Sequence, residues 1–497
     1  MSALASFGRT HLIGVGGAGM SAVALLLAAR GLEVTGSDAR DGVVLDGLRS
    51  AGVTVWVGHD AAHVEGARTV VVSTAVRASN PELARARELG LTVLHRSQAL
   101  AALMSDRRAI AVAGAHGKTT TSAMVAAALA AAGLDPSYAI GGTVLAQPEA
   151  VGGAHDGSGD VFVAEADESD GSFLAYAPTV AVVTNVEPDH LDHYGSQEAF
   201  ERAFEEFVGR VVDGGALVAC ADDDGARRLV EAVGPDLGAR GARVLTYGRT
   251  PGADVVVSGY RAQDGGSTCT LRTAHPALHD AAGAAPLELH LALTVPGSHN
   301  ALNAAAAWVA ARLVGAGAQA AADGLAGFRG TGRRFEDRGT VAGVRVVDDY
   351  AHHPTEVAAL LRAARPVARG GRLLVLFQPH LYSRTRAFAA QFAAALDLAD
   401  AVVVTDVYAA REDPDPSVTG ALVTERVRTP GKAELVPDRV EAARRIAARA
   451  RPGDLLLTVG AGDVTELGAV VLETLAAAAT GGVDGAEATG TPPRSAR

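Results

Sequence analysis

The stretch GAHGKTTT, residues 114–121, carries residue types that bind phosphate groups in proteins. It comes close to the pattern G-x-x-x-x-G-K-[ST], in which backbone N–H groups surround the phosphates and the lysine reaches the β and γ oxygens. The first glycine of that pattern would fall at Val112, so the loop is not the standard one. Lys118 is one of only two lysines among the 497 residues, the other being Lys432, which makes its retention here informative. We therefore expect a phosphate site, with Thr119 placed to meet Mg²⁺.

Acidic side chains follow the next two strand-like runs, DVFVAEAD and TVAVVTNV. The segment EADESDGS supplies four carboxylates within six residues, those of Glu165, Asp167, Glu168 and Asp170. The segment TNVEPDHLDH adds Asn185, Glu187, Asp189 and His190. Clustered acids repel one another unless a cation or hydrogen-bond donors compensate, which fits Mg²⁺ beside ATP. A solvated acidic loop and a structural histidine are the simpler alternatives for each segment alone, but together with the lysine loop they favour a phosphoryl-transfer site.

A second glycine-rich turn, IGVGGAGMS, lies near the start of the chain. Gly14, Gly16 and Gly19 satisfy G-x-G-x-x-G between a strand-like and a helical run, where a pyrophosphate can sit at the helix N-terminus. Asp38 follows Gly19 by 19 residues, at the end of the next strand, where an acid can bind a ribose. The pattern first suggests NAD, but a nucleotide-sugar pyrophosphate looks the same to such a loop. A glycine turn that merely packs helix on strand is the simpler alternative.

The elements that must position these residues alternate between strand and helix. Runs such as THLIGVG, LEVTGSD and TVVVSTAV are separated by helical runs such as MSAVALLLAARG, which predicts βαβ units on a parallel sheet. Similar blocks begin at RAIAVAGAHGKTTT and after GFRGTGRRFEDRG, and short strands from about 240 to 295 predict an antiparallel appendage on the second block. We expect an α/β protein with Rossmann-like first and third domains around a central domain that carries the mononucleotide-binding loop. The expected boundaries are 1–106, 107–325 and 326–480, followed by a disordered tail, 481–497.

Composition excludes several classes of protein. A hydrophobic content of 48% is ample for folded cores, and a formal charge of −12 argues against a general nucleic-acid binder. No apolar stretch is long enough to span a membrane, and the N-terminal residues lack the pattern of a signal peptide. The two cysteines, Cys220 and Cys269, cannot form a disulfide framework and fit a reducing cytoplasm.

Two candidate phosphate-binding loops in one chain exclude several classes of enzyme. A dehydrogenase has no use for the lysine loop, and an ordinary ATPase has none for the first glycine turn, whereas a ligase that activates a nucleotide-linked carboxylate with ATP needs both. At this point the chain resembles the Mur ligases of peptidoglycan synthesis. The resemblance extends over nearly the whole chain and rests on these ordered motifs: HLIGVGGAGMS, GSD, GAHGKTTT, AEADESDGSF, TNVEPDHLD, PGSHNALNAAAA, GTGRRFE, DDYAHHPTE, FQPHLYSRTR and DVYAARE.

The resemblance implies roles for individual residues. The UDP-sugar would be bound by Gly14, Gly16, Gly17, Gly19 and Asp38, with His59 and Ser73 as weaker candidates. ATP would be bound by Gly114, Ala115, His116, Gly117, Lys118, Thr119, Thr120, Asn300, Asn303 and Arg334. Mg²⁺ would be held by Thr119, Glu165 and His190. Catalysis would depend on Lys118, Glu165, His190, Arg334 and Asp349. The amino acid would be surrounded by His352, His380 and Arg384.

The same resemblance implies the reaction. It points to the alanine-adding branch of the family, in which ATP converts the lactyl carboxylate of UDP-N-acetylmuramate into an acyl phosphate that L-alanine attacks. Ala115 and Leu381 depart from the family pattern, which has threonine and arginine there, and no spare lysine exists to be carbamylated as in other branches. A tripeptide-recycling ligase is the nearest alternative. An NAD(P)-dependent oxidoreductase and a non-catalytic UDP-sugar sensor are the alternatives from other classes. We expect a cytoplasmic enzyme, a monomer or homodimer, with small-molecule partners and with neither nucleic acid nor membrane among them.

Overall fold

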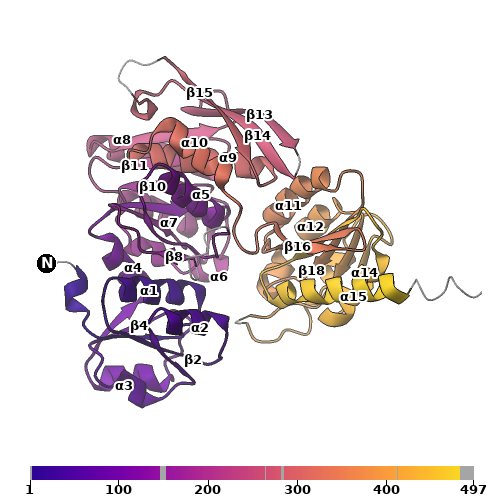
Figure 1. The fold of residues 1–497 in the computed structure, drawn as a ribbon, viewed down its shortest axis with the longest axis horizontal. Helices are drawn as coiled ribbons and strands as arrows, with labels where there is room; N and C mark the ends of the chain where they lie inside the picture. The colour runs from indigo at the N-terminus through magenta and orange to yellow at the C-terminus, as the bar shows by residue number, and fades with distance from the viewer. Residues whose placement is uncertain (1–2, 146–152, 264, 281–284, 411, 482–497) are drawn as a thin grey trace, which may run out of the picture. The chain divides into compact units, whose positions relative to one another are not determined.

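The computed structural model of the protein describes residues 3–145, 153–263, 265–280, 285–410 and 412–481 (Figure 1). The chain divides into two compact units, Met1–Arg261 with Gly266–Thr331 and Gly332–Arg497 with Ala262–Gly265. Among the described residues the strands form three sheets, one in each of the three predicted α/β blocks. The boundaries of the three domains stay a prediction, and the predicted tail beyond residue 481 lies outside the described residues.

The first sheet has the order β3-β2-β1-β4-β5, and all of its pairs are parallel. Its strands are β1 (Thr10–Ile13), β2 (Val34–Asp38), β3 (Thr54–Val57), β4 (Thr69–Val72) and β5 (Thr92–His95). The helices of this segment are α1 (Ala18–Ala29), α2 (Val43–Ser50), α3 (Pro81–Glu88) and α4 (Arg96–Met104). Because β1 lies between β2 and β4, the strand order reverses at β1, and ligands of such folds bind in the crevice beyond its carboxyl end.

The second sheet is the largest, with the order β15-β14-β13-β12-β11-β10-β6-β9-β7-β8. Its strands are β6 (Arg108–Ala113), β7 (Ser137–Ala139), β8 (Ala154–His155), β9 (Val161–Glu165), β10 (Val180–Val183), β11 (Ala216–Cys220), β12 (Arg243–Gly248), β13 (Val255–Gln263), β14 (Gly266–Thr273) and β15 (Leu287–Leu293). The antiparallel appendage was only partly right. β12 and β13 pair in parallel and continue the sheet, whereas β14 and β15 pair antiparallel.

Helices cover both faces of the second sheet, because its central strands are apolar on both sides. The helices are α5 (Lys118–Ala131), α6 (Leu191–Tyr194), α7 (Gln197–Gly209), α8 (Asp224–Ala239), α9 (Ser298–Leu313) and α10 (Ala318–Gly327). Alternate residues of β6, such as Ile110 and Val112, pack with the alanine-rich α5 and α9, whereas Ala111 and its neighbours face α7. The core on the α7 side also contains residues of α1 and α4, so the first two sheets belong to one compact unit.

The second unit carries a six-stranded sheet with the order β16-β17-β21-β18-β19-β20. Its strands are β16 (Glu336–Val341), β17 (Val344–Asp349), β18 (Leu373–Phe377), β19 (Ala401–Val404), β20 (Ala433–Leu435) and β21 (Leu455–Val459). Only β16 runs antiparallel to its neighbour, and cores lie on both faces of the sheet. Its helices are α11 (Pro354–Val367), α12 (Tyr382–Leu396), α13 (Ala421–Thr424), α14 (Arg439–Arg449) and α15 (Leu467–Gly481). Across the described part of the chain, no helix combines the length and apolarity needed to cross a membrane.

Candidate active site

The candidate phosphate site lies where three neighbouring strands of the second sheet end. β10, β6 and β9 are adjacent and parallel, so their carboxyl ends meet at one edge. The lysine loop follows β6, the acidic segment EADESDGS includes the end of β9, and the segment TNVEPDHLDH follows β10. The sheet therefore brings together the three segments in which the sequence predicted phosphoryl-transfer residues.

The loop between β6 and α5 needs glycine at both of its ends. Gly114 has a φ of +135°, and a Cβ there would overlap Oγ1 of Thr184. Gly117 has a φ of +82°, and a Cβ there would lie 2.9 Å from Oδ1 of Asn303. The backbone N–H of His116 donates to Oδ1 of Asn185 over 3.0 Å. These contacts fix the loop at the N-terminus of α5, where backbone N–H groups and the helix dipole favour an anion.

Lys118 is folded over this loop and paired with Glu168. Its Nζ lies 2.9 Å from Oε1 and 2.8 Å from Oε2 of Glu168 and donates to the carbonyl oxygen of Gly114 over 2.8 Å. Only 14% of the Lys118 side chain is exposed, and that of Glu168 is fully buried. Burial raises the pKa of Glu168 to about 7, although the Lys118 charge acts to lower it. Burial alone would lower the pKa of Lys118, but Glu168 and Asp167 outweigh it and raise that pKa.

The predicted magnesium ligands lie next to this pair. Oγ1 of Thr119 donates to Oε1 of Glu165 over 3.0 Å, and the other carboxylate oxygen accepts from the backbone N–H of Gly141 at 2.7 Å. His190 has a φ of +52°, unusual for a residue with a side chain, and its Nε2 lies 3.8 Å from Oε1 of Glu168. A hydroxyl and carboxylates suit Mg²⁺, which prefers oxygen ligands. The donor set therefore fits the ion, with Thr119 and Glu165 as its better ligands and the imidazole as a weaker one.

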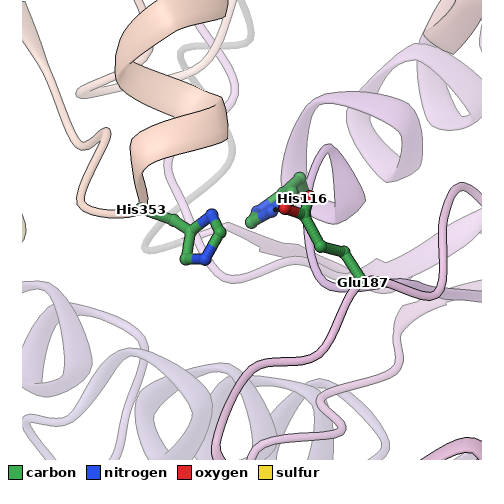
Figure 2. A group of neighbouring side chains, drawn as sticks. All are labelled: His116, Glu187 and His353. Atoms are coloured by element: carbon green, nitrogen blue, oxygen red, sulfur yellow. Dashed lines mark hydrogen bonds and ion pairs between the residues drawn. The ribbon is translucent and has the colours of Figure 1, made fainter. Parts of the chain in front are cut away.

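His116 and Glu187 form a second contact between the loop and the segment after β10. Nε2 of His116 lies 3.1 Å from Oε2 of Glu187, and Figure 2 shows the two side chains meeting from these segments. On α9, Asn303 donates to Oδ1 of Asn300 over 3.1 Å, and both asparagines are buried. Because Asn303 also lies against Gly117, the structure brings the predicted ATP-binding asparagine beside the lysine loop. The two neighbouring loop residues, Ala115 and Thr120, occupy the same turn and the first turn of α5.

The first glycine loop follows β1 and is held by the predicted ribose-binding acid. The backbone N–H of Gly16 donates to Oδ2 of Asp38 over 2.9 Å. Gly14 has a φ of +76°, Gly17 precedes α1 as its N-cap, and a Cβ at Gly19 would lie 2.6 Å from Nη1 of Arg96. Asp38 thus closes the glycine loop at the crevice where this fold class binds its ligands.

The weaker candidates of the first sheet lie at neighbouring strand ends. Ser73 follows β4, and His59 follows β3. Nδ1 of His59 lies 3.1 Å from Oγ of Ser37, the residue before Asp38. His59 therefore lies close to Asp38, which bonds the glycine loop. Ser73 is followed by Thr74, whose hydroxyl donates to Asp170 of the acidic segment over 3.2 Å.

The remaining predicted residues gather within the second unit. Asp349 ends β17, where its carboxylate accepts the backbone N–H groups of Phe335 and Ala351. Burial raises the pKa of Asp349 to about 6, although Arg334 acts to lower it. The guanidinium of Arg334 lies 5.1 Å from the centre of the Tyr350 ring.

The three predicted amino-acid-binding residues are neighbours in that unit. The rings of His352 and His380 are 5.9 Å apart. Burial lowers the pKa of His352 to about 3, with the Arg384 charge among the minor causes in the same direction, so its imidazole is neutral. Leu381, with a φ of +67°, turns the chain into α12, whose first turn contains the buried Arg384. Two histidines and an arginine in one place can bind a carboxylate by charge-assisted hydrogen bonds.

Comparison with known proteins gives one consistent result. Three family models match successive parts of the chain: "Mur ligase family, catalytic domain" at 9–108, "Mur ligase middle domain" at 112–311 and "Mur ligase, glutamate ligase domain" at 333–462. A UDP-N-acetylmuramate–L-alanine ligase from Kineococcus radiotolerans is 60% identical over 481 residues, which cover 95% of this chain and 97% of the relative. The chain belongs to the Mur ligase family.

Solved structures of other Mur ligases agree with the fold of this one. A UDP-N-acetylmuramate-alanine ligase from Thermotoga maritima superposes with a TM-score of 0.77 at 30% identity, covering 95% of this chain and 99% of the other. A murein peptide ligase from Psychrobacter arcticus gives 0.67 at 25% identity, covering 94% and 99%. The predicted family and the three-part α/β fold are thereby confirmed.

Two residues for which the sequence predicts no role lie beside the predicted site residues in the structure of this Mur ligase. Glu168 was one of four clustered acids, and only the fold shows that it is the one paired with Lys118. Arg96, in the first turn of α4, lies against Gly19 and donates to Asp167 over 2.7 Å. Neither residue lies within a glycine-rich pattern, but the excess of acids around a single lysine was a signal that further cations had to be near.

Proposed function

We propose that this Mur ligase joins L-alanine to the lactyl carboxylate of UDP-N-acetylmuramate at the expense of ATP. The observation that carries the proposal is the identity of 60% along nearly the whole length of a UDP-N-acetylmuramate–L-alanine ligase. The geometry supports it, because a lysine loop at a helix N-terminus meets a cluster of carboxylates at one sheet edge, as phosphoryl transfer requires. The glycine loop closed by Asp38 supplies a separate place for the sugar nucleotide.

The first chemical step activates the carboxylate. A lactyl carboxylate oxygen attacks the γ-phosphorus of ATP, the bond to the β–γ bridging oxygen breaks, and ADP leaves with an acyl phosphate formed. Two anions must approach each other in this step, so Lys118 and the N–H groups at the start of α5 bind the phosphates and offset their charge. Bound Mg²⁺, held by Thr119 and Glu165 with His190 nearby, would neutralise phosphate oxygens further.

Glu168 prepares Lys118 for that role. In the structure its carboxylate and the carbonyl oxygen of Gly114 hold the ammonium beside the loop. Because the pKa of Lys118 is raised, the side chain stays charged across the physiological pH range. Asn300 and Asn303 would bind the nucleotide, and Arg334 and Asp349 would have catalytic roles, as the family resemblance implies.

The second step forms the amide. The neutral amine of L-alanine attacks the acyl carbon, and phosphate leaves from the tetrahedral intermediate, so no nucleophilic side chain is needed. Arg384 would bind the L-alanine carboxylate, with His352 and His380 as further donors or acceptors. His352 stays neutral at physiological pH, so Arg384 supplies the positive charge for the carboxylate and His352 can contribute only a neutral hydrogen bond.

The cellular setting follows from the reaction. The enzyme works in the cytoplasm, where ATP is available, as a monomer or a homodimer. Both cysteines, Cys220 and Cys269, are buried and free, which suits a reducing compartment.

One assay tests the proposal against its nearest alternative, attachment of a tripeptide to the same sugar nucleotide. ADP release is measured with ATP, Mg²⁺ and UDP-N-acetylmuramate, and with either L-alanine or the tripeptide as the amine. We expect turnover with L-alanine and little with the tripeptide. Turnover with the tripeptide alone would identify a recycling ligase. No turnover with either amine, together with heat released on adding NAD, would overturn the ligase proposal.

A further inference from the structure

A buried carboxylate beneath the first glycine loop is surrounded by histidines. Glu82 lies in the first turn of α3, which begins with Asn80 as N-cap and Pro81 as its first residue. The Glu82 side chain is fully buried. Nδ1 of His59 lies 3.0 Å from its Oε2, and Nδ1 of His63 lies 2.7 Å from its Oε1.

Two more side chains complete this cluster. The hydroxyl of Ser37 donates to Oε2 of Glu82 over 2.6 Å, and Nε2 of His11 lies 3.7 Å from Oε1. His11 is itself fully buried and holds Thr35 through its other ring nitrogen. Five side chains from β1, β2, α3 and the segment after β3 thus converge, although they are scattered from position 11 to position 82. No family motif quoted above contains Glu82.

The surroundings keep Glu82 ionised. Burial acts to raise its pKa, but the neighbouring donors of His11, Ser37 and His63 outweigh burial and lower the pKa to about 2. An ionised carboxylate only accepts hydrogen bonds, so the ring nitrogens that face it must carry hydrogen. For His59 this assigns hydrogen to Nδ1 and leaves Nε2, on the other side of the ring, for another partner.

The place of His59 shows what that partner can be. Its ring contacts Ser37, whose neighbour Asp38 closes the glycine loop through the N–H of Gly16. The backbone N–H of Gly58 donates to the carbonyl oxygen of Asp38 over 2.7 Å, so the chain before His59 is tied to the same strand end. About a quarter of the His59 side chain is exposed, whereas the carboxylate that holds it has no exposure. His59 is therefore held by a buried carboxylate and is itself partly exposed, close to the residue that bonds the first glycine loop.

We propose that Glu82 is a positioning residue for the sugar nucleotide, holding the His59 ring so that Nε2 reaches the ribose or diphosphate beside Asp38. This inference rests on the proposed function, because it takes the crevice to bind a uridine diphosphate. A ring fixed before binding loses little rotational freedom when the nucleotide arrives, and preorganisation of this kind raises affinity. Glu82 acts only through His59 and does not touch the ligand.

The other half of the cluster provides a matched control. His63 bonds the second oxygen of Glu82, and its ring stacks on Trp56, with centroids 4.5 Å apart and planes inclined by 7°. His63→Phe keeps the stacked ring but removes a hydrogen bond to the same carboxylate. If Glu82 only stabilised the fold, losing His63 would weaken UDP binding in proportion to its effect on stability, as losing Glu82 would.

The test measures the dissociation constant of UDP by calorimetry with the full-length enzyme. His59→Ala should weaken UDP binding about tenfold, the loss expected for one hydrogen bond to a ribose or charged phosphate group. Glu82→Met, which removes both acceptors at similar volume, should weaken it by a similar factor, and Glu82→Gln, which keeps one acceptor, should recover part of the loss. The double variant His59→Ala/Glu82→Met should bind no worse than His59→Ala alone. His63→Phe should bind UDP as the wild type does.

Steady-state kinetics separate this role from a purely structural one. In the Glu82 variants the KM for UDP-N-acetylmuramate should rise while kcat at saturation stays unchanged, because only nucleotide binding is affected. Unchanged UDP affinity in His59→Ala would overturn the inference even if the Glu82 variants did not fold. Additive losses in the double variant would also overturn it. Either result could occur in an enzyme that still uses L-alanine, so failure here is distinct from failure of the proposed function.

Discussion

Replacing Lys118 by methionine should remove both catalytic power and a pH-dependent part of the stability. The ammonium contacts both oxygens of Glu168 and the carbonyl oxygen of Gly114, all at 2.8–2.9 Å. With ATP bound, its charge would stabilise the phosphates, and losing one such donor typically lowers kcat by about 10²–10³-fold. We therefore expect ADP formation to fall by at least about a hundredfold, while UDP binding at the separate glycine loop is retained.

The effect on stability follows from the partner that is left behind. Burial raises the pKa of Glu168 from 4.5 to about 7, so its contribution to stability is complete below pH 4.5 and is lost as the pH rises through 7. In Lys118→Met the carboxyl keeps that burial but loses the cation that lowers its pKa, so the pKa moves above 7. The folded variant then holds a proton that the unfolded chain has released. Its free energy of unfolding should keep falling by about 1.4 kcal/mol per pH unit above pH 7, where the wild-type contribution has levelled off.

Urea unfolding at pH 7 and pH 9 measures this difference. The gap between wild type and Lys118→Met should be wider at pH 9 than at pH 7, by at most about 3 kcal/mol, which is the limit for a carboxyl that stays protonated throughout. In the control, Lys118→Met/Glu168→Gln, the extra gap should disappear because no buried carboxyl remains to ionise, while activity stays lost. A gap that does not change with pH would refute the reasoning about Glu168, and a variant with a tenth of wild-type turnover would refute the role of Lys118.

The remaining predictions concern each substrate in turn. Arg384→Met should raise the KM for L-alanine by about 10- to 150-fold, the loss of one charge-assisted bond, with little change in the KM for ATP; a rise for ATP alone would move Arg384 to the phosphate site. Gly16→Val should abolish UDP binding in calorimetry, because a side chain there meets Asp38, and undiminished binding would mean that the loop does not hold the nucleotide. Glu165→Gln should raise the Mg²⁺ concentration needed for half-maximal ADP release by about tenfold or more, with unchanged UDP affinity as its control; an unaltered Mg²⁺ requirement would remove Glu165 from the metal site.

The order of strands and helices was predictable because the spacing of apolar residues differs clearly between the strand-like and the helical runs of this chain. The alternation of apolar runs predicted the parallel sheets, and the rule that ligands lie beyond strand ends placed the lysine loop and both polar segments at one edge. The rule does not predict which side chains pair with one another at that edge of the sheet. Which of four clustered acids reaches Lys118 depends on the turn after β9, and a shift of one residue would exchange Glu168 for Asp167.

Glu82 shows a second limit of prediction from the sequence. The sequence NPELARARELG indicates a helix, and Asn80 does cap it, yet nothing in the local pattern says that Glu82 is buried. Its partners come from β1, β2 and the segment after β3, so the cluster exists only once the helix packs across the sheet. Long-range polar clusters of this kind carry no periodicity that a single sequence could reveal.

The scarcity of lysine gives the enzyme a built-in covalent probe of its predicted phosphate site. An amine-directed reagent has only two side-chain targets in the whole chain. Lys432 is largely buried and donates to the carbonyl oxygen of Asp397 over 2.6 Å, far along the sequence from any predicted substrate residue. Lys118 is as buried as Lys432, with 14% against 15% of the side chain exposed, and it stays charged, so both amines are acylated slowly. The ratio of the two rates therefore reports on whether the loop at the head of α5 is occupied, without any engineered label.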